Sequence, residues 1–213
     1  PDVVRQRDQY DGAIAEIDQD LGLLLDELRR RGELRHTLIV LVGDHGEAFG
    51  EHRAFEHGND TYLEELHVPL VMALPDRVPA GVRVPGVVSL RDVPATIGEV
   101  LGFAGPSWPL PGHSLARLWQ PGGGDAADTV LAEVELIPRG GQPFYPNRRG
   151  DVRSILAWPW QLITVAREVE LYDLVADPGQ HRNLAADTAH AATRDSLAAA
   201  LSRWRRDAIP AKL

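Results

Sequence analysis

The chain has 213 residues and a formal net charge of −9, from 22 Lys and Arg against 31 Asp and Glu. Its 44% hydrophobic and 25% charged residues are typical of folded globular proteins and not of disordered chains. The acidic balance argues against nucleic-acid binding, because such binding needs many Lys and Arg to neutralise phosphates. The chain has no cysteine, so disulfide and thiolate chemistry are excluded, and no apolar run approaches the roughly 18 residues of a membrane-spanning helix.

The first half of the chain predicts alternating helices and buried strands. Apolar residues recur at steps of three and four over residues 10–28, which predicts a helix with one buried stripe. Residues 37–42 form an unbroken apolar run rich in β-branched side chains, which predicts a strand buried on both faces of a parallel sheet. A second buried strand is expected at 68–74, after a short helix at 61–66, and a further helix at 89–101.

The second half has a different texture. Residues 105–124 are rich in Pro and Gly, and they suggest a boundary between an α/β unit at 1–124 and a small α+β unit at 125–213. Four strand-like runs then follow at hairpin spacing and predict a small antiparallel sheet. A terminal alanine-rich helix at about 185–208 is expected to cover one face of it. The four runs are residues 129–136, 152–158, 160–166 and 169–172.

The densest group of reactive side chains follows the strand at 37–42, within residues 43–58. In open α/β sheets ligands bind beyond the carboxyl ends of strands, and a glycine turn there lets adjacent side chains converge. Asp44 and His45 can therefore reach one cation, which suits Mn, Zn or Fe and is compatible with Ca or Mg. The alternative is an ordinary turn in which Asp44 caps the following amides. His52 is expected to be a structural or solvated histidine.

Several motifs in a fixed order carry a more specific signal than any one of them. Their order resembles that of the C-terminal portion of a sulfatase of the alkaline-phosphatase superfamily. The resemblance implies part of a mainly parallel α/β sheet with flanking helices, followed by a small antiparallel sheet and a terminal helix. The motifs are the helix at 10–22, Gly-Asp-His-Gly-Glu at 43–47, Gly-Glu-His at 50–52, and the segments 57–71, 88–97, 112–115, 160–163 and 170–174.

The resemblance assigns roles to individual residues. It implies that Asp44 and His45 bind the divalent cation of the active site, calcium in the first place, with Mn, Mg or Zn as alternatives. It implies that His57, thirteen residues after Asp44, contacts the sulfate or phosphate and protonates the leaving oxygen. The alternative for His57 is a simple loop histidine. Glu64 and Glu65 match an acidic pair of the family and are expected to cap and anchor a helix.

The chain departs from the family in its nucleophile. No Cys/Ser-x-Pro-x-Arg motif occurs, and neither does the family's N-terminal pair of aspartate ligands. Both are expected upstream of Pro1, which would make the chain a piece of a longer enzyme and inactive on its own.

Three functions follow from the resemblance. The first is a metal-dependent sulfuric ester hydrolase acting on a small anionic ester. The second is a phosphodiester or phosphonate monoester hydrolase, or a phosphoglycerol-type transferase, and the third is a non-catalytic binding module. Arg139, Arg148 and Arg149 are expected to be solvated rather than to bind substrate. The sequence predicts neither an oligomeric state nor a location.

Overall fold

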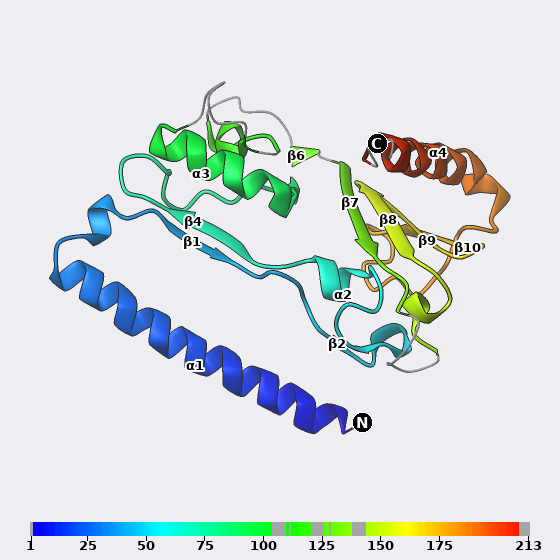
Figure 1. Cartoon of the computed structure of the whole chain (residues 1–213), viewed down its shortest axis with the longest axis horizontal. Helices are drawn as coiled ribbons and strands as arrows, with labels where there is room; N and C mark the ends of the chain where they lie inside the picture. Colours follow the sequence, from blue (N-terminus) through cyan, green and yellow to red (C-terminus); the bar gives the residue numbers. More distant parts are fainter. Residues whose placement is uncertain are drawn as a thin grey trace, which may run out of the picture.

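The computed structural model describes residues 2–103, 110, 112–120, 126–127, 129–137 and 144–208. Figure 1 shows a long helix, a two-stranded ribbon and a second helix on one side, and a four-stranded sheet with a C-terminal helix on the other. The predicted boundary at residues 124 and 125 lies outside the described residues and stays a prediction. No helix in the described part of the chain combines the length and apolarity needed to cross a membrane.

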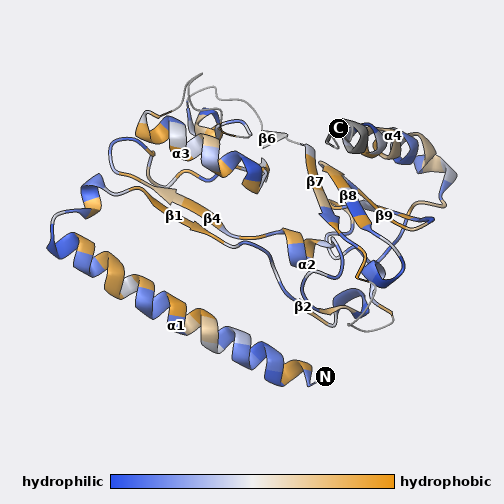
Figure 2. Cartoon of the chain, viewed as in Figure 1, coloured by the Kyte–Doolittle hydropathy of each residue, from blue (hydrophilic) through white to orange (hydrophobic). Residues whose placement is uncertain are grey.

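Helix α1 (Val3–Arg30) confirms the helix predicted from the apolar spacing and extends it toward the N-terminus. The Asp2 side chain caps its first turn, and Gly32 follows its last turn with φ of 76°. The expectation of a buried stripe is wrong for this chain, since no residue of α1 is buried. The helix touches its neighbours near its first half, where Tyr10 packs edge-on against Phe49 at 5.3 Å. Five more of its apolar residues are exposed, and the apolar residues of this helix are orange in Figure 2; the five are Val4, Ile14, Ile17, Leu23 and Leu24.

Strands β1 (Ile39–Val42) and β4 (Leu70–Ala73) form the ribbon, with Ile39 opposite Ala73. The pairing is antiparallel, and Leu41 and Val71 are exposed, so the expectation of parallel pairing with both faces buried is wrong for these two strands. The physical reason lies in the connection. A parallel crossover normally packs a long helix on the sheet, whereas the one α-helix within residues 43–69 is the four-residue α2 (Leu63–Leu66).

The remaining elements of the first half are short. Helix α3 (Val93–Leu101) confirms the helix predicted at 89–101 but begins four residues later, with a proline in its first turn, and it ends at Gly102. The hairpin β2 (Ala48–Phe49) and β3 (Phe55–Glu56) is antiparallel, and β5 (Gly86–Val87) pairs in parallel with β6 (Ala126–Ala127). Single 3₁₀ turns occur at Leu34–His36, Glu51–Arg53, Leu90–Asp92, Leu115–Trp119, Pro146–Arg148 and Thr188–His190.

The predicted antiparallel sheet is confirmed. Its strands are β7 (Thr129–Val134), β8 (Val152–Ala157), β9 (Trp160–Val165) and β10 (Glu168–Asp173), in the order β10-β9-β8-β7. All neighbouring strands in it are antiparallel. Because side chains alternate along a strand, the sheet presents two different apolar faces.

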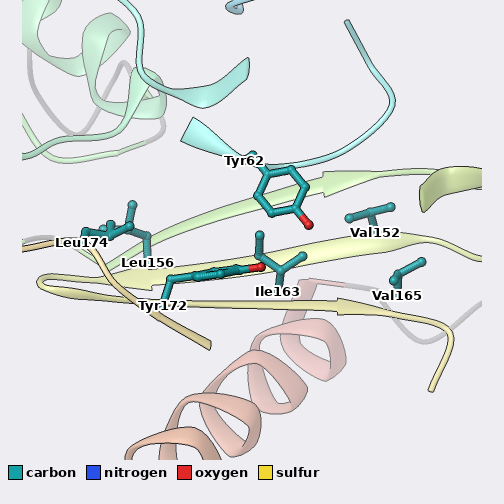
Figure 3. Packing of buried hydrophobic residues seen from close by; sticks show 7 residues of the cluster. All are labelled: Tyr62, Val152, Leu156, Ile163, Val165, Tyr172 and Leu174. Carbon is teal, nitrogen blue, oxygen red and sulfur yellow. The ribbon is translucent and has the colours of Figure 1, made fainter. Parts of the chain in front are cut away.

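The two faces of this sheet have different partners. One face contributes Ile155, Leu162 and Leu171, which pack against Leu197 and Leu201 of helix α4 (Ala191–Ala208), so this helix covers a face as predicted. The other face receives the ring of Tyr62, which lies over the sheet on the side away from α4 (Figure 3). The segment around Tyr62 follows the predicted catalytic residues, so the C-terminal sheet is packed directly against the candidate site.

Candidate active site

The turn after β1 carries the first two predicted residues. Its last residue, Gly46, lies so close to α2 that an added Cβ would come within 1.9 Å of the Glu64 carbonyl oxygen. The Gly46 amide donates to the Glu65 carbonyl at 2.8 Å, which fixes the turn against the helix. Only glycine fits this approach, and the turn therefore holds Asp44 and His45 at the carboxyl end of β1.

Asp44 presents a free carboxylate at this turn. Its side chain is 90% exposed, and its Oδ1 accepts from the His45 amide at 3.1 Å. The backbone amides of Asp44 and His45, followed by the charge of the His45 ring, hold the pKa of Asp44 below its ordinary value. The side chain is thus ionised at neutral pH, and its carboxylate oxygens are open to solvent as ligand atoms for a cation.

The His45 ring is oriented by its own neighbour. Its Nδ1 lies 2.8 Å from the Gly46 carbonyl oxygen, and since a carbonyl only accepts, Nδ1 carries the proton and donates. In the neutral ring Nε2 then keeps its lone pair, and this atom lies 3.7 Å from Asp44 Oδ2. The Gly46 carbonyl is also the main reason why the pKa of His45 is raised above its ordinary value.

The donor set at this turn suits a divalent cation. A carboxylate oxygen and an imidazole nitrogen, whose other ring nitrogen is held by a carbonyl, form a common pair of metal ligands. Among the described residues, no group of three or more His, Asp or Glu side chains is arranged to hold a metal ion. The cation site therefore stays a prediction based on two residues.

The structure places His57 beside these two residues. The hairpin of β2 and β3 folds the chain back, and the rings of His45 and His57 stack with centroids 4.1 Å apart and an interplanar angle of 27°. His57 Nδ1 lies 2.9 Å from Glu47 Oε2 and donates to that carboxylate. The Glu47 carboxylate thereby fixes one edge of the ring, and Nε2 is left for a ligand.

The backbone after His57 is also held closely. The Asn59 side chain donates to the carbonyls of Phe55 and His57, both at 3.1 Å, and the Gly58 amide donates to Glu65 Oε2 at 2.7 Å. Glu65 is only 5% exposed, and burial, with a further contribution from Asp60, raises its pKa to about 7. Glu65 thus anchors the loop and the helix together, in line with the anchoring role expected for it.

Other predicted residues lie elsewhere or serve the fold. His52 stacks on Tyr62 at 3.7 Å with an angle of 11°, which agrees with a structural role. Arg148 donates to the Ile137 carbonyl and Arg149 pairs with Glu168, so both are engaged within the protein. Arg139 lies outside the described residues.

Sequence reasoning missed several residues that shape the site. Glu47 belongs to the motif at 43–47, but its contact with His57 depends on the hairpin between them. Asn147, Gln161 and Gln180 come from the C-terminal half and are at most 1% exposed. The one available signal was a glutamine placed between apolar residues in the strand run at 160–166.

Comparison with known proteins shows a consistent relationship. The sulfatase-family model matches residues 2–103. Arylsulfatase K of Mus musculus is 30% identical over 84% of this chain and 32% of its own length, and the N-acetylglucosamine-6-O-sulfatase of Bacteroides thetaiotaomicron is 28% identical over 82% and 31%. The chain therefore spans about a third of the length of these curated relatives.

Solved structures agree with the sequence relatives. A protein in complex with its substrate D-glucosamine-2-N,6-O-disulfate matches with a TM-score of 0.77 at 25% identity, over 91% of this chain and 39% of its own. The phosphonate monoester hydrolase of Agrobacterium radiobacter matches with a TM-score of 0.79 at 28% identity, over 98% and 42%. The predicted alkaline-phosphatase-like fold class is thereby confirmed. Fold, motif order and relatives agree that residues 2–103 are part of a sulfatase-family domain of the alkaline-phosphatase superfamily.

Proposed function

We propose that the full-length protein hydrolyses sulfate esters of small anionic substrates. Asp44 and His45 would hold a divalent cation, and His57 would contact the sulfate and protonate the leaving oxygen. The observation that carries the proposal is the stacking of His57 on His45 at 4.1 Å within part of a sulfatase-family domain. This contact supports the proposal because it brings the His57 ring next to the two candidate metal ligands.

The side chains of the site would take different roles, with two binding the cation and one delivering a proton. When bound, the cation supplies positive charge that stabilises the sulfate oxygens and activates the nucleophile. Asp44 contributes an ionised carboxylate, and His45 contributes Nε2 because Nδ1 is engaged by Gly46. Glu47 fixes the His57 ring through Nδ1, so Nε2 is the atom from which the imidazolium form delivers a proton to the leaving oxygen.

The relatives suggest a first substrate to test. One is an N-acetylglucosamine-6-O-sulfatase, and one solved neighbour holds a disulfated glucosamine as its substrate. A sulfated amino sugar is therefore the first candidate, measured as release of inorganic sulfate by the full-length protein. A phosphonate monoester is the matched alternative, because the phosphonate monoester hydrolase covers 98% of this chain. A larger kcat/KM for the phosphonate would favour the second function.

The metal assignment is tested by Asp44→Ala in the full-length protein. Loss of one oxygen ligand should remove the bound divalent cation, which elemental analysis of the purified protein measures. Asp76→Ala is the control, since Asp76 is an exposed aspartate that faces Arg35 at 3.8 Å away from the site. Stoichiometric metal in the Asp44 variant would contradict the assignment.

The role of His57 is tested by how the rate loss in His57→Ala depends on the leaving group of the ester. His57→Ala should slow esters of poorly acidic alcohols by about 10²- to 10⁴-fold and nitrophenyl esters far less, because only the former need a proton in the transition state. The exposed His67 provides the control, as His67→Ala. Equal losses on both ester classes would point to binding or structure instead.

A further inference from the structure

The loop after His57 is held by the C-terminal half of the chain. Residues 58–62 form no regular structure before α2, yet five hydrogen bonds join this loop and Leu63, the first residue of α2, to distant residues. The partners lie 88 or more positions later in the sequence, in or beside the four-stranded sheet. They are Asn147, whose side chain and amide both donate, Gln161, Glu170 and Gln180.

Asn147 makes the contact nearest to His57. It lies in the 3₁₀ turn Pro146–Arg148 and is 1% exposed. Its Nδ2 donates to the Gly58 carbonyl at 2.9 Å, and its backbone amide donates to the Asn59 carbonyl at 3.2 Å. Its own carbonyl accepts from the Ile137 amide at 3.2 Å, which ties the turn to the end of β7.

The geometry shows which half of the Asn147 amide matters. Its Oδ1 is buried without a hydrogen-bond partner among the described residues, whereas Nδ2 is engaged. An unpartnered buried acceptor costs stability, so a plain packing role would favour an apolar side chain here. The side chain therefore serves as a donor to the residue that follows His57.

A pair of glutamines continues the contact along the loop. Gln161 Nε2 donates to the Thr61 carbonyl at 2.8 Å, and Gln180 Oε1 accepts from the Leu63 amide at 2.9 Å. The two glutamines are joined by a bond of 2.8 Å from Gln180 Nε2 to Gln161 Oε1. Both are almost completely buried, which makes the contact rigid.

The position of His57 depends on this backbone. Its side chain is 53% exposed and touches only the His45 ring and Glu47 among the contacts described, so packing alone does not fix it. We infer that Asn147 is a positioning residue for His57, through its hydrogen bond to the Gly58 carbonyl. The catalytic consequence rests on the proposed function, while the structural link does not.

The first test uses kinetics of the full-length protein. Asn147→Ala removes the donor, and Asn147→Leu removes it while filling the space. Both should lower kcat on esters of poor leaving groups by about 10- to 100-fold, with KM changed by less than about twofold. Asn183→Ala is the matched control, because Asn183 bonds the backbone of Val169, Leu171 and Ala185 and not the loop; it should leave kcat unchanged.

A double-mutant cycle separates positioning from general damage. If Asn147 acts through His57, then Asn147→Ala in the His57→Ala background should change kcat by less than about twofold. The same fold loss in both backgrounds would overturn the inference. A fall in kcat with Asn183→Ala equal to that with Asn147→Ala would also overturn it.

The second test does not need activity. Hydrogen exchange of the peptides covering residues 55–66 should be faster in both Asn147 variants than in the wild type and in Asn183→Ala. Unchanged exchange in both Asn147 variants would overturn the inference whatever the kinetics show. The two ideas can fail separately. If the Asn147 variants exchange faster and the wild-type protein hydrolyses neither sulfate nor phosphonate esters, the positioning link is supported and the proposed function is rejected.

Discussion

The Tyr62 hydroxyl offers a sharp test of how tightly the site is joined to the C-terminal sheet. It donates to Glu170 Oε2 at 2.6 Å, and Tyr172 donates to the same oxygen at 2.9 Å. Burial and the Glu170 carboxylate raise the pKa of Tyr62, so the phenol stays protonated and able to donate. Tyr62→Phe removes this bond and keeps the ring, which still stacks on His52.

The size of the effect follows from the bond that is lost. A hydrogen bond to a charged group contributes about 1.5–3 kcal/mol, and the lower end applies because Tyr172 continues to satisfy Glu170. A loss of about 1.5 kcal/mol raises the population of the opened loop roughly tenfold. The amide of Leu63, bonded to Gln180 in the closed loop, should therefore exchange with solvent about ten times faster in native-state hydrogen exchange.

Tyr172→Phe provides the matched control for this experiment. Its hydroxyl donates to Glu170, two positions away in the same strand, so this bond itself does not join the loop to the sheet. The exchange of Leu63 should stay within about twofold of the wild type in this variant. Equal acceleration in the two variants, or none in Tyr62→Phe, would refute the reasoning.

Three further changes test the packing around the site. Burial raises the pKa of Asp60 to about 6, so its contribution to stability is complete below about pH 4 and is lost as the pH rises through 6. Asp60→Asn should therefore reduce the change in the free energy of unfolding between pH 4 and pH 8, measured with urea, by about 2 kcal/mol. The pH dependence that remains is then due to Glu65. An unchanged slope would contradict this origin. Gly46→Ala should cost about 1–3 kcal/mol in the same assay because its Cβ meets the Glu64 carbonyl, and wild-type stability would show that the turn is free to move. Leu162→Ala should cost about 2–5 kcal/mol, since the side chain is fully buried between the sheet and α4; a loss below 1 kcal/mol would mean that the two do not pack as described.

Local patterns predicted the elements of this fold well. The hairpin spacing of the four C-terminal runs identified all the strands of that sheet, because antiparallel neighbours need only short turns. The antiparallel pairing of β1 with β4 was not predicted, since an apolar run does not encode the identity or direction of its partner. The exposed stripe of α1 was missed for a related reason: periodicity shows that a helix has an apolar face but not what covers it.

The candidate site was predictable in its residues but not in its supports. Asp44, His45 and His57 lie within fourteen consecutive positions, and the family resemblance singled them out. The amides that hold the loop come from positions far along the chain, and no local signal links Asn147 to Gly58. Such contacts depend on how the loop packs against the C-terminal sheet, which a single sequence read locally does not show.

The long sequence separation of these contacts has a consequence for how the protein is made. During synthesis Gly58 emerges from the ribosome 89 residues before its partner Asn147. Leu63 emerges 117 residues before its partner Gln180. During that interval the loop lacks these C-terminal partners, and β1 and β4 are already free to pair. The packing of the loop after His57 is therefore completed late in synthesis, only when the C-terminal sheet has formed.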